Sequence, residues 1–488
     1  MTTVEEDLFE TTVGLEIHVE LATAAKMFCA CEVAFGGDPN TRTCPVCLGM
    51  PGSLPVPNEK AVEYTMKIGL ALGCRIAEHS LFHRKNYFYP DMPKNYQISQ
   101  YDEPLCSGGA VSISGEWGET RVGITRVHLE EDTGKSFHIG GTGRIADSEY
   151  SLEDFNRAGT PLVEIVTEPD IHSAEEARAF VTELRSILEG LGVSDVRMEE
   201  GSLRVDANVS VRRIGETEHG AKVEVKNMNS IRSVGRALEY EERRQRDALS
   251  AGEPLVQETR HFDEKSGTTS SMRTKEYAFD YRYFPEPDMV PFEPAAEWLE
   301  RLRASLPETP AARRARYASD YGLGEKDIEV LTATSRVAKW FDDAAAAYQG
   351  DAKKIANWII ADLYGLLNEA GIELYEAKIA PGQLGGLVSL VDSGAISGKQ
   401  AKVVLQSMFE TGKDADALVE ERGLRQESDE GAIESFVDEV IAENGDAADK
   451  VRGGNTGTIG FLVGQVMKKS RGRANPQMVN ELLRRKLT

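Results

Sequence analysis

Two carboxylates and a histidine near the start of the chain alternate with apolar residues. Glu16, His18 and Glu20 fall between apolar residues at positions 15, 17, 19 and 21. This period-two pattern predicts a strand with one buried face. Its other face would carry a carboxylate, an imidazole and a carboxylate in a row. Such a row is either a candidate chemical site or an ordinary solvated surface, where most strand carboxylates lie.

Four of the six cysteines form two close pairs. Cys29 and Cys31 are followed, after twelve residues, by Cys44 and Cys47. Thiolate pairs at this spacing suit tetrahedral zinc, and six cysteines in so long a chain do not make a disulfide scaffold. Four thiolate ligands would fill the tetrahedral coordination of the zinc ion and leave no open position for a substrate or a catalytic water. We therefore predict a structural zinc ion within this Gly- and Pro-rich loop, with buried or free thiols as the alternative.

Three further segments carry groups that could do chemistry. Residues 128–132 end in three adjacent carboxylates, which favour either a magnesium site or an exposed turn. Residues 160–169 resemble a strand and contain Glu164. Residues 82–96 combine cations, aromatic rings and prolines, which is typical of a binding loop; buried aromatic packing is the alternative.

Strands and helices must position these groups. Residues 203–211 alternate again and place Arg204, Asp206 and Asn208 on one face, and residues 222–229 present Lys226 in the same way. Strands with charged faces indicate a curved sheet whose polar side is the working surface, or simply an antiparallel sheet with one wet face. Residues 173–190 have the pattern of an amphipathic helix, and Ser173 and Glu176 predict a capping box. From about residue 295, helical patterns replace the strand patterns.

Composition sets the broad class. The chain has 488 residues, 41% of them hydrophobic, and a net charge of −24, which indicates two to four globular domains. We find no run of the ~18 apolar residues that a membrane span needs. The acidic N-terminus lacks the apolar core of a signal peptide. We expect a cytoplasmic protein that does not enter a membrane.

The C-terminal end has the opposite charge to the rest of the chain. Residues 450–488 carry nine Lys or Arg against Glu481 alone. A basic tail on an acidic body is consistent with contact to a polyanion. A solvated tail helix is the equally weighted alternative.

Taken together, the segments resemble the B subunit of the tRNA-dependent Asp/Glu amidotransferase. The matching stretches span nearly the whole chain in the order of that family: GLEIHVE at 14–20, RKNYFYPD at 84–91, YQISQ at 96–100, HLEED at 128–132, NRAGTPLVE at 156–164, EEGSLR at 199–204, DYRYFPEPD at 280–288 and GFLVGQ at 460–465.

The resemblance implies an α+β fold in three parts. An antiparallel-sheet cradle with helices at 1–295 would hold the active site and the zinc loop. An all-α helical domain would follow at 296–408, and a small all-α tail at 409–488. The resemblance also implies a reaction in which ATP phosphorylates the side-chain carboxyl of Glu or Asp misacylated onto tRNA. Ammonia then displaces the phosphate.

The resemblance further implies which residues act. The catalytic Mg²⁺ and its ATP would be held by Glu16, His18, Glu131 and Glu164. Strand alternation places Glu130 rather than Glu131 on the face of His128, so a bulge or strand end at Glu130 would be needed. Lys85 is a candidate contact for a phosphate or for the acyl carboxylate. Weaker candidates on the same surface are Arg204, Asp206, Asn208 and Lys226.

The resemblance implies partners too. We find neither a Gly/Ser-rich amidase signature nor a Cys–His arrangement that could hydrolyse glutamine. Ammonia would therefore come from an amidase-type A subunit, held by a small C subunit in a heterotrimer, and the basic tail would contact misacylated tRNA. Two other functions remain as alternatives: a non-catalytic tRNA-binding scaffold, and a zinc hydrolase using Glu16 and His18, which lacks a third histidine ligand nearby.

Overall fold

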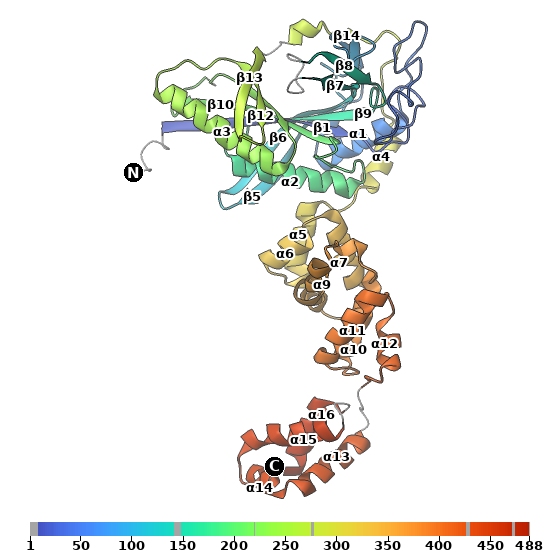
Figure 1. The fold of residues 1–488 in the computed structure, drawn as a ribbon, viewed down its shortest axis with the longest axis vertical. Helices are drawn as coiled ribbons and strands as arrows, with labels where there is room; N and C mark the ends of the chain where they lie inside the picture. The colour runs from blue at the N-terminus through green and yellow to red at the C-terminus, as the bar shows by residue number, and fades with distance from the viewer. Residues whose placement is uncertain are drawn as a thin grey trace. The chain divides into compact units, whose positions relative to one another are not determined.

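The fold comes from a computed structural model, which describes residues 8–140, 148–218, 220–274, 278–425, 430–470 and 474–487. The acidic start of the chain and Arg471 and Arg473 of the basic end lie outside these ranges. The chain divides into two compact units, Met1–Pro310 and Ala311–Thr488, coloured blue to yellow and yellow to red in Figure 1. Each unit is described by itself.

A nine-stranded sheet forms the centre of the first unit. Its strand order is β13-β12-β11-β10-β1-β9-β6-β5-β2. The strands, in chain order, are β1 (Phe9–Glu20), β2 (Arg75–Ile76), β5 (Cys106–Gly115), β6 (Gly118–Glu131), β9 (Pro161–Thr167), β10 (Leu203–Arg213), β11 (Val223–Met228), β12 (Glu258–Asp263) and β13 (Thr268–Thr274). The strand predicted from residues 13–21 is β1, and it lies between β10 and β9, antiparallel to both.

Alternation along β1 sends its apolar residues to the core of the unit. Leu15, Ile17 and Val19 are at most 1% exposed, whereas Glu16 and His18 between them are partly exposed. Three helices, α1 (Glu59–Ala71), α2 (Ala174–Leu191) and α3 (Ile231–Ser250), add apolar side chains to the same hydrophobic cluster. Figure 1 shows α2 and α3 along one side of the sheet. The other face of β1 is left for polar groups.

Helix α2 begins where the sequence predicted, but its capping differs in one detail. Ser173 Oγ accepts a hydrogen bond from the backbone N–H of Glu176 at 3.1 Å. The Glu176 carboxylate accepts from the backbone N–H of His172, at 2.8 Å, rather than from that of Ser173. Both bonds satisfy N–H groups around the helix start. Phe180 and Leu184 then pack into the core at 0% and 1% exposure.

The sheet is mostly antiparallel, as predicted for the cradle, but one of its neighbouring pairs is parallel. Strand β12 runs parallel to β11. The connection between them contains the whole of α3, and a parallel pair needs a long crossover of this kind. The other neighbouring pairs of the nine-stranded sheet are antiparallel. The predicted α+β class, a sheet domain followed by helices, is confirmed.

Two smaller sheets and one helix complete the first unit. One sheet has the order β14-β3-β4, from Phe284–Pro285, His83–Asn86 and Tyr96–Ser99, and the other pairs β7 (Lys135–Ile139) with β8 (Tyr150–Asp154). A 3₁₀ helix covers Ala278–Tyr281. Helix α4 (Ala296–Ala304) contributes Leu302 to the core of this unit.

The second unit is helical and contains two separate hydrophobic clusters. The first cluster runs from Tyr317 to Val419 and the second from Ile433 to Leu487. The α-helices are α5 (Pro310–Tyr321), α6 (Glu325–Leu331), α7 (Ser335–Ala347), α8 (Ala352–Asn357), α9 (Tyr364–Ala370), α10 (Pro381–Asp392), α11 (Gly398–Thr411), α12 (Ala415–Glu421), α13 (Glu430–Glu443), α14 (Gly445–Arg452), α15 (Ile459–Lys469) and α16 (Pro476–Leu487). Shorter helical segments cover Trp358–Leu363, Leu374–Glu376 and Thr456–Thr458.

The packing of two helices bears on the predicted domain boundaries. Helix α4 packs with the first unit, although it follows position 295, and α12 packs in the first helical cluster, although it follows position 408. The three-part division at those positions stays a prediction. Among the helices that the structure describes, none is both long and apolar enough to cross a membrane.

We expect Ser173→Ala to lower the free energy of unfolding of the first unit by ~1 kcal/mol, because the N–H of Glu176 loses its acceptor at the start of α2. Urea denaturation and amide hydrogen exchange along α2 measure the change. Ser173→Thr is the matched control, since it keeps the capping hydroxyl and should remain close to wild type. Equal protection of α2 amides in Ser173→Ala and wild type would contradict the assigned cap.

Candidate functional site

The polar face of the large sheet brings groups from four strands into one row. His18 on β1 stands opposite Arg204 on β10 and opposite Glu164 on β9. Glu164 in turn stands opposite His128 on β6. Residues directly opposite on one face of antiparallel strands have side chains in contact range. Two imidazoles, a carboxylate and a guanidinium therefore meet above the centre of the sheet.

Two carboxylates and two histidines form the tightest part of this row. His18 Nε2 lies 3.8 Å from Glu130 Oε1 and 3.7 Å from Glu164 Oε2. His128 Nε2 lies 3.5 Å from Glu164 Oε2 and 3.8 Å from Glu130 Oε2. Each imidazole thus faces both carboxylates. One ligand atom from each of His18, Glu130 and Glu164 lies within 4.8 Å of the others, so these three residues could hold a metal ion.

The structure brings Glu130, and not Glu131, to this cluster. Glu130 and Glu131 are consecutive residues of β6, so their side chains leave the strand on opposite faces. Lys94 Nζ donates to the Glu131 carboxylate, and the backbone N–H of Ile98 donates to it at 2.9 Å. The same carboxylate borders a cavity near Cys47. Glu131, which the resemblance placed on the metal, therefore lies apart from His18 and Glu164.

A β-bulge early in β6 explains this arrangement. The register with β9 shifts between Ile124 and Arg126. Val122 and Ile124 before the shift, and Val127 and Leu129 after it, are all buried in the core. The extra residue changes which positions face inward. The resemblance required a bulge or strand end at Glu130 to bring Glu131 into the site. The bulge instead lies at Thr125, and it places Glu130 on the face of His18.

A cavity of about 460 Å³ opens beside the cluster. Its walls include His18, Glu130, Lys85, Arg204 and Lys226. Lys85 belongs to β3 of the small sheet, and its Nζ lies 5.0 Å from the centre of the Tyr281 ring. Cations and carboxylates thus line one space, an arrangement suited to a charged ligand that also carries a metal ion.

Neighbouring charges shift the pKa values of groups in this cavity. Burial disfavours the charge on Glu130, but the nearby His128 and the charges of Lys85 and His18 hold the pKa of Glu130 well below its ordinary range. Burial also opposes the charge on Lys85, yet Tyr283 and the carboxylates of Glu130 and Glu164 raise the pKa of Lys85 above its ordinary value. The charged forms support each other.

A second group of charges includes Asp132 and Arg204, which line the same cavity, and their neighbours Glu20 and Arg157. Arg204 donates to Asp132 Oδ2 at 2.8 Å. Burial and the neighbouring charge of Asp132 raise the pKa of Glu20 to about 8. Burial opposes the charge on Asp132, but Arg204 and Arg157 lower the pKa of Asp132 to about 2. The Nε of Arg204 is buried and has no hydrogen-bond partner in the protein. A buried N–H on a guanidinium is suited to an anionic oxygen of a ligand.

The remaining predicted residues lie on the same face, further along β1 and β10. Asn208 Nδ2 donates to Glu16 Oε1 at 2.8 Å. Lys226 Nζ lies 2.7 Å from Asp206 Oδ2. Burial opposes the charge on Lys226, but Asp206 and Glu224 raise the pKa of Lys226. These residues border the cluster of His18, Glu130 and Glu164 and do not enter it.

Arg126 is a group that the sequence reasoning missed. Its guanidinium lies 3.6 Å from Glu164 Oε1, and its Nε lies 3.4 Å from His128 Nδ1. Arg126 lies on the same face of β6 as His128 and Glu130. The alternation that placed His128 and Glu130 on one face could therefore also have predicted the position of Arg126.

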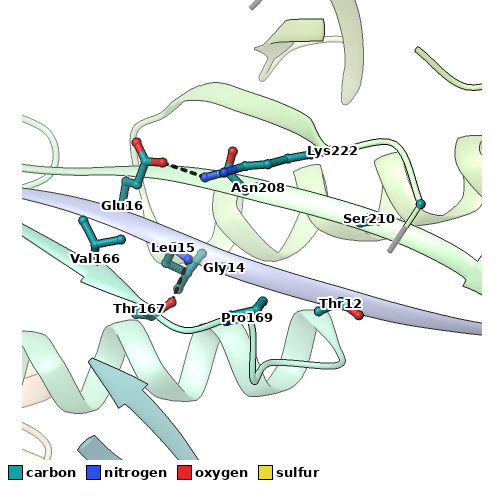
Figure 2. Close-up of a pocket in the computed structure, with 11 residues that line it drawn as sticks. Thr12, Gly14, Leu15, Glu16, Val166, Thr167, Pro169, Asn208, Ser210 and Lys222 are labelled. Carbon is teal, nitrogen blue, oxygen red and sulfur yellow. Dashed lines mark hydrogen bonds between the residues drawn. The ribbon is translucent and has the colours of Figure 1, made fainter. Parts of the chain in front are cut away.

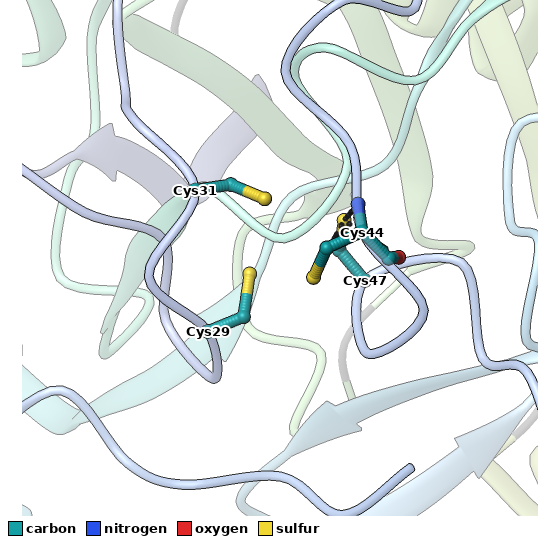
Figure 3. A group of neighbouring side chains, drawn as sticks. All are labelled: Cys29, Cys31, Cys44 and Cys47. Atoms are coloured by element: carbon teal, nitrogen blue, oxygen red, sulfur yellow. Dashed lines mark hydrogen bonds between the residues drawn. The ribbon is translucent and has the colours of Figure 1, made fainter.

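The four paired cysteines converge, as their spacing predicted. Figure 3 shows Cys29 and Cys31 on one loop segment facing Cys44 and Cys47 on another. Their four sulfur atoms all lie within 4.8 Å of one another, and Cys44 Sγ and Cys47 Sγ are 3.9 Å apart. Four sulfurs at this separation fit the tetrahedron around a metal ion with bonds of ~2.3 Å.

Charge at the cysteine cluster is partly balanced by a buried lysine. Lys26 is 1% exposed, and its Nζ lies 3.7 Å from Cys47 Sγ. A hydrogen bond with Cys29, the backbone N–H of Cys44 and the charge of Lys26 lower the pKa of Cys47 to about 4, although burial opposes the thiolate. The thiolate form is the one that binds metals. Cys74 and Cys106 are also buried, but they lie outside this cluster.

Comparison with known proteins identifies the family. Residues 11–300 match the GatB/GatE catalytic domain, and residues 339–487 match the GatB domain. The chain belongs to the GatB family. It is 52% identical over 479 residues to the B subunit of the aspartyl/glutamyl-tRNA(Asn/Gln) amidotransferase of Carboxydothermus hydrogenoformans, a match that covers 98% of this chain and 99% of that protein. The corresponding B subunits of Moorella thermoacetica and Anaeromyxobacter dehalogenans are 53% and 52% identical over 98% of this chain, with 100% and 99% of their own lengths covered.

The basic end of this GatB-family chain is partly neutralised within its own unit. Lys469 pairs with Glu439, at 2.7 Å, and with Glu443. Lys486 pairs with Glu434 at 2.7 Å and Asp438 at 2.6 Å. These four acidic residues belong to α13, which precedes the basic stretch and packs against it in the same hydrophobic cluster. Contact of this end with tRNA stays a prediction.

We expect the protein purified without chelators to contain about one tightly bound metal ion per chain at the cysteine cluster, and Cys44→Ser to lose it, since structural sites need all four ligands. Elemental analysis measures the metal, and limited proteolysis within residues 29–55 measures the order of the loop. Cys74→Ser removes a thiol outside the cluster and serves as the control. Equal metal content in Cys44→Ser and wild type would rule out these ligands.

Proposed function

We propose that this chain activates and amidates the misacylated residue of Glu-tRNA(Gln), Asp-tRNA(Asn), or both. The side-chain carboxylate of that residue attacks the γ-phosphorus of ATP, and ADP leaves. Ammonia then attacks the carbon of the acyl phosphate, and inorganic phosphate leaves as the amide forms. The observation that carries this proposal is the cluster of His18, Glu130 and Glu164 beside a cavity lined by Lys85 and Arg204. The relatives of this chain are named as B subunits of an aspartyl/glutamyl-tRNA(Asn/Gln) amidotransferase, which supports the proposal.

The cluster fits a magnesium ion that serves the nucleotide. Mg²⁺ is commonly bound by one or two carboxylates together with phosphate oxygens, and Glu130 and Glu164 supply the carboxylates. Bound there, Mg²⁺ would neutralise charge on the phosphates during transfer. His18 would be a third ligand. Glu16 lies two residues along the same face, where we assign it a role in positioning the nucleotide.

Two cations are placed to meet the negative charge of the reacting groups. Lys85 lines the cavity from β3 of the small sheet, and the charges of Glu130 and Glu164 help to raise its pKa. Arg204 has an unpartnered Nε in the same cavity. We assign both to phosphate or acyl-carboxylate oxygens, where preorganised charges stabilise transfer without solvent rearrangement. We assign Asp206, Asn208 and Lys226 to the part of the binding surface next to these two cations.

We assign the cysteine cluster to a structural zinc ion. Four thiolates are the ligand set that zinc prefers, and they leave no open coordination position for a substrate. This donor set argues against catalysis at the cysteine cluster itself. The ion would hold residues 29–47 against the cavity that Glu131, Lys94 and Lys26 border.

Ammonia would reach this site from a partner. We propose an amidase-type A subunit as the source and a small C subunit that completes a heterotrimer, because the sequence lacks a glutamine-hydrolysing motif. Misacylated tRNA would deliver the carboxylate to the polar face of the sheet, with its body recognised by shape more than by base sequence.

We expect Glu164→Gln, assembled with the A and C subunits, to lose ATP-dependent conversion of Glu-tRNA to Gln-tRNA by at least about 100-fold, because removing a charged ligand removes several kcal/mol of transition-state stabilisation. Basal glutamine hydrolysis should persist, since it belongs to the partner. Both rates are measured on one preparation. Full conversion by Glu164→Gln would instead favour a tRNA-binding scaffold whose chemistry lies on the partner.

A second experiment tests whether Glu130 or Glu131 binds the metal ion. We expect Glu130→Gln to weaken binding of Mn²⁺, a spectroscopic substitute for Mg²⁺, by about 10-fold to 100-fold, the range typical of disrupted metal sites. Glu131→Gln should leave Mn²⁺ affinity near wild type, because its side chain leaves β6 on the other face. Electron paramagnetic resonance titration measures both. The reverse order of effects would restore Glu131 to the metal site.

A further inference from the structure

Two tyrosine rings are stacked on each other at the small sheet formed by β14, β3 and β4. The rings of Tyr101 and Tyr283 are nearly parallel, with their centres 4.3 Å apart and an angle of 10° between their planes. Tyr101 follows β4 by two residues and Tyr283 directly precedes β14, and both strands pair with β3. Tyr283 is partly buried, whereas Tyr101 is 47% exposed. Tyr101 is therefore accessible although a second ring supports it.

A chain of contacts links the stacked rings to the catalytic cavity. Lys85 lines that cavity, and its Nζ lies 5.0 Å from the centre of the Tyr281 ring. Tyr281 meets Tyr283 edge to face, with ring centres 6.1 Å apart. Burial raises the pKa of Tyr283 to about 12, and the charges of Glu130 and Glu164 add to this shift although Lys85 opposes it. Tyr283 therefore lies close enough to the two carboxylates to be affected by their charge.

Strand β4 gives a second link between the rings and the metal cluster. Ser99, the last residue of β4, donates from its Oγ to Glu130 Oε2 at 3.2 Å. Tyr101 follows Ser99 by two residues, which span at most ~7 Å of chain. The exposed ring is thus attached beside the carboxylate that the cluster of His18, Glu130 and Glu164 contains.

The turn that carries Tyr281 and Tyr283 is held in an unusual conformation. Arg282, between them, has a φ of 45°, in the left-handed region that residues other than glycine adopt at a cost. Asn86 Nδ2 donates to the backbone carbonyls of Tyr281 and Arg282, at 3.2 and 2.8 Å. Strained backbone of this kind is concentrated at functional sites, where it fixes the position of a group. The turn therefore favours a binding role for the rings over simple packing.

The substrate of the proposed reaction brings a base close to the reacting carboxylate. In misacylated tRNA, only the amino acid, an ester and one ribose separate that carboxylate from the 3′-terminal adenine. Unpaired bases of RNA are commonly bound by stacking on aromatic side chains. Among the described residues that line the catalytic cavity, and among those that line the smaller hollow beside Glu16 in Figure 2, none is Phe, Tyr or Trp. The stacked tyrosines offer the aromatic surface that these two hollows lack.

We infer that Tyr101 stacks on the 3′-terminal adenine of misacylated tRNA while the carboxylate of the aminoacyl residue lies near Glu130 and Glu164. The inference rests on the proposed function and adds a contact for the acceptor end. The adenine of ATP has the same ring chemistry, and the experiment separates the two sources. The exposure of Tyr101 outside the cavity favours a base that a macromolecule delivers from solvent.

Three substitutions of Tyr101 separate stacking from packing. In the assembled complex, we expect Tyr101→Ala and Tyr101→Leu to raise the KM for Glu-tRNA(Gln) about tenfold, equivalent to ~1.4 kcal/mol, which is within the range typical of a base stacked on an aromatic ring. Tyr101→Phe keeps the ring and should stay close to wild type. The KM for ATP should be the same in all three. Tyr150→Ala, at a tyrosine of β8 that is 55% exposed, is the matched control and should behave as wild type.

A binding measurement without ATP reports the stacking directly. The probe is an acceptor-stem minihelix whose 3′-terminal adenine is replaced by 2-aminopurine, a base whose fluorescence falls when it stacks. We expect the wild-type complex and Tyr101→Phe to quench this fluorescence, and Tyr101→Ala and Tyr101→Leu to lose most of the quenching. Thermal unfolding of the variants near the wild-type temperature checks that the fold is intact.

Several results would overturn the assignment. One is a wild-type KM for Glu-tRNA(Gln) and full quenching in Tyr101→Ala, and another is equal behaviour of Tyr101→Leu and Tyr101→Phe, which would show packing rather than stacking. A raised KM for ATP alone would assign the ring to the nucleotide, and loss of the A subunit from Tyr101→Ala would assign it to a protein contact. If the wild-type complex quenches the probe but cannot convert Glu-tRNA with ATP, the proposed function fails while the stacking contact stands.

Discussion

Strand β1 can place a side chain on only two faces, and it is paired on both edges. Because β9 and β10 hold it in antiparallel register, Leu15, Ile17 and Val19 must enter the core, and Glu16 and His18 must then face away from it. Shifting this strand by one residue would bury a carboxylate and expose the apolar set, which would cost far more than the fold could tolerate. The same register brings His18 level with Glu164 and Arg204. The position of the charged groups thus follows from apolar burial.

The carboxylates of the site lie close to cations, which stabilise their charged forms. His18 and His128 each lie between the same two carboxylates, while Lys85 and Arg204 approach from neighbouring elements. A buried carboxylate alone would take up a proton, but neighbouring cations keep Glu130 ionised. The carboxylates that we propose as cation ligands and the cations that we propose as phosphate contacts are consequently in place before any ligand binds. Such preorganisation is what phosphoryl transfer requires of a protein.

Local patterns in the sequence predicted much of this arrangement. Alternation gave the polar face of β1, the cysteine spacing gave the four-sulfur cluster, and the apolar stripe gave α2. The features that were missed depend on distant pairing. Nothing near Glu258 indicates that β12 runs parallel to β11, because that direction is set by the crossover of α3. The acidic residues of α13 neutralise Lys469 and Lys486 only after folding brings them together. The choice between Glu130 and Glu131 depended on one register shift in β6.

That register shift has a consequence for how the chain can vary. The bulge at Thr125 determines whether the even-numbered or the odd-numbered residues in the rest of β6 face His18 and Glu164. After the bulge, Glu130 lies near His18, whereas Glu131 borders the cavity that Cys29 and Cys47 also line, so the two adjacent carboxylates have different neighbours. If β6 kept all its residues but paired with β9 without the bulge, Glu130 and Glu131 would exchange faces, and Val127 and Leu129 would leave the core. Retaining the bulge is therefore a condition for keeping Glu130 beside His18.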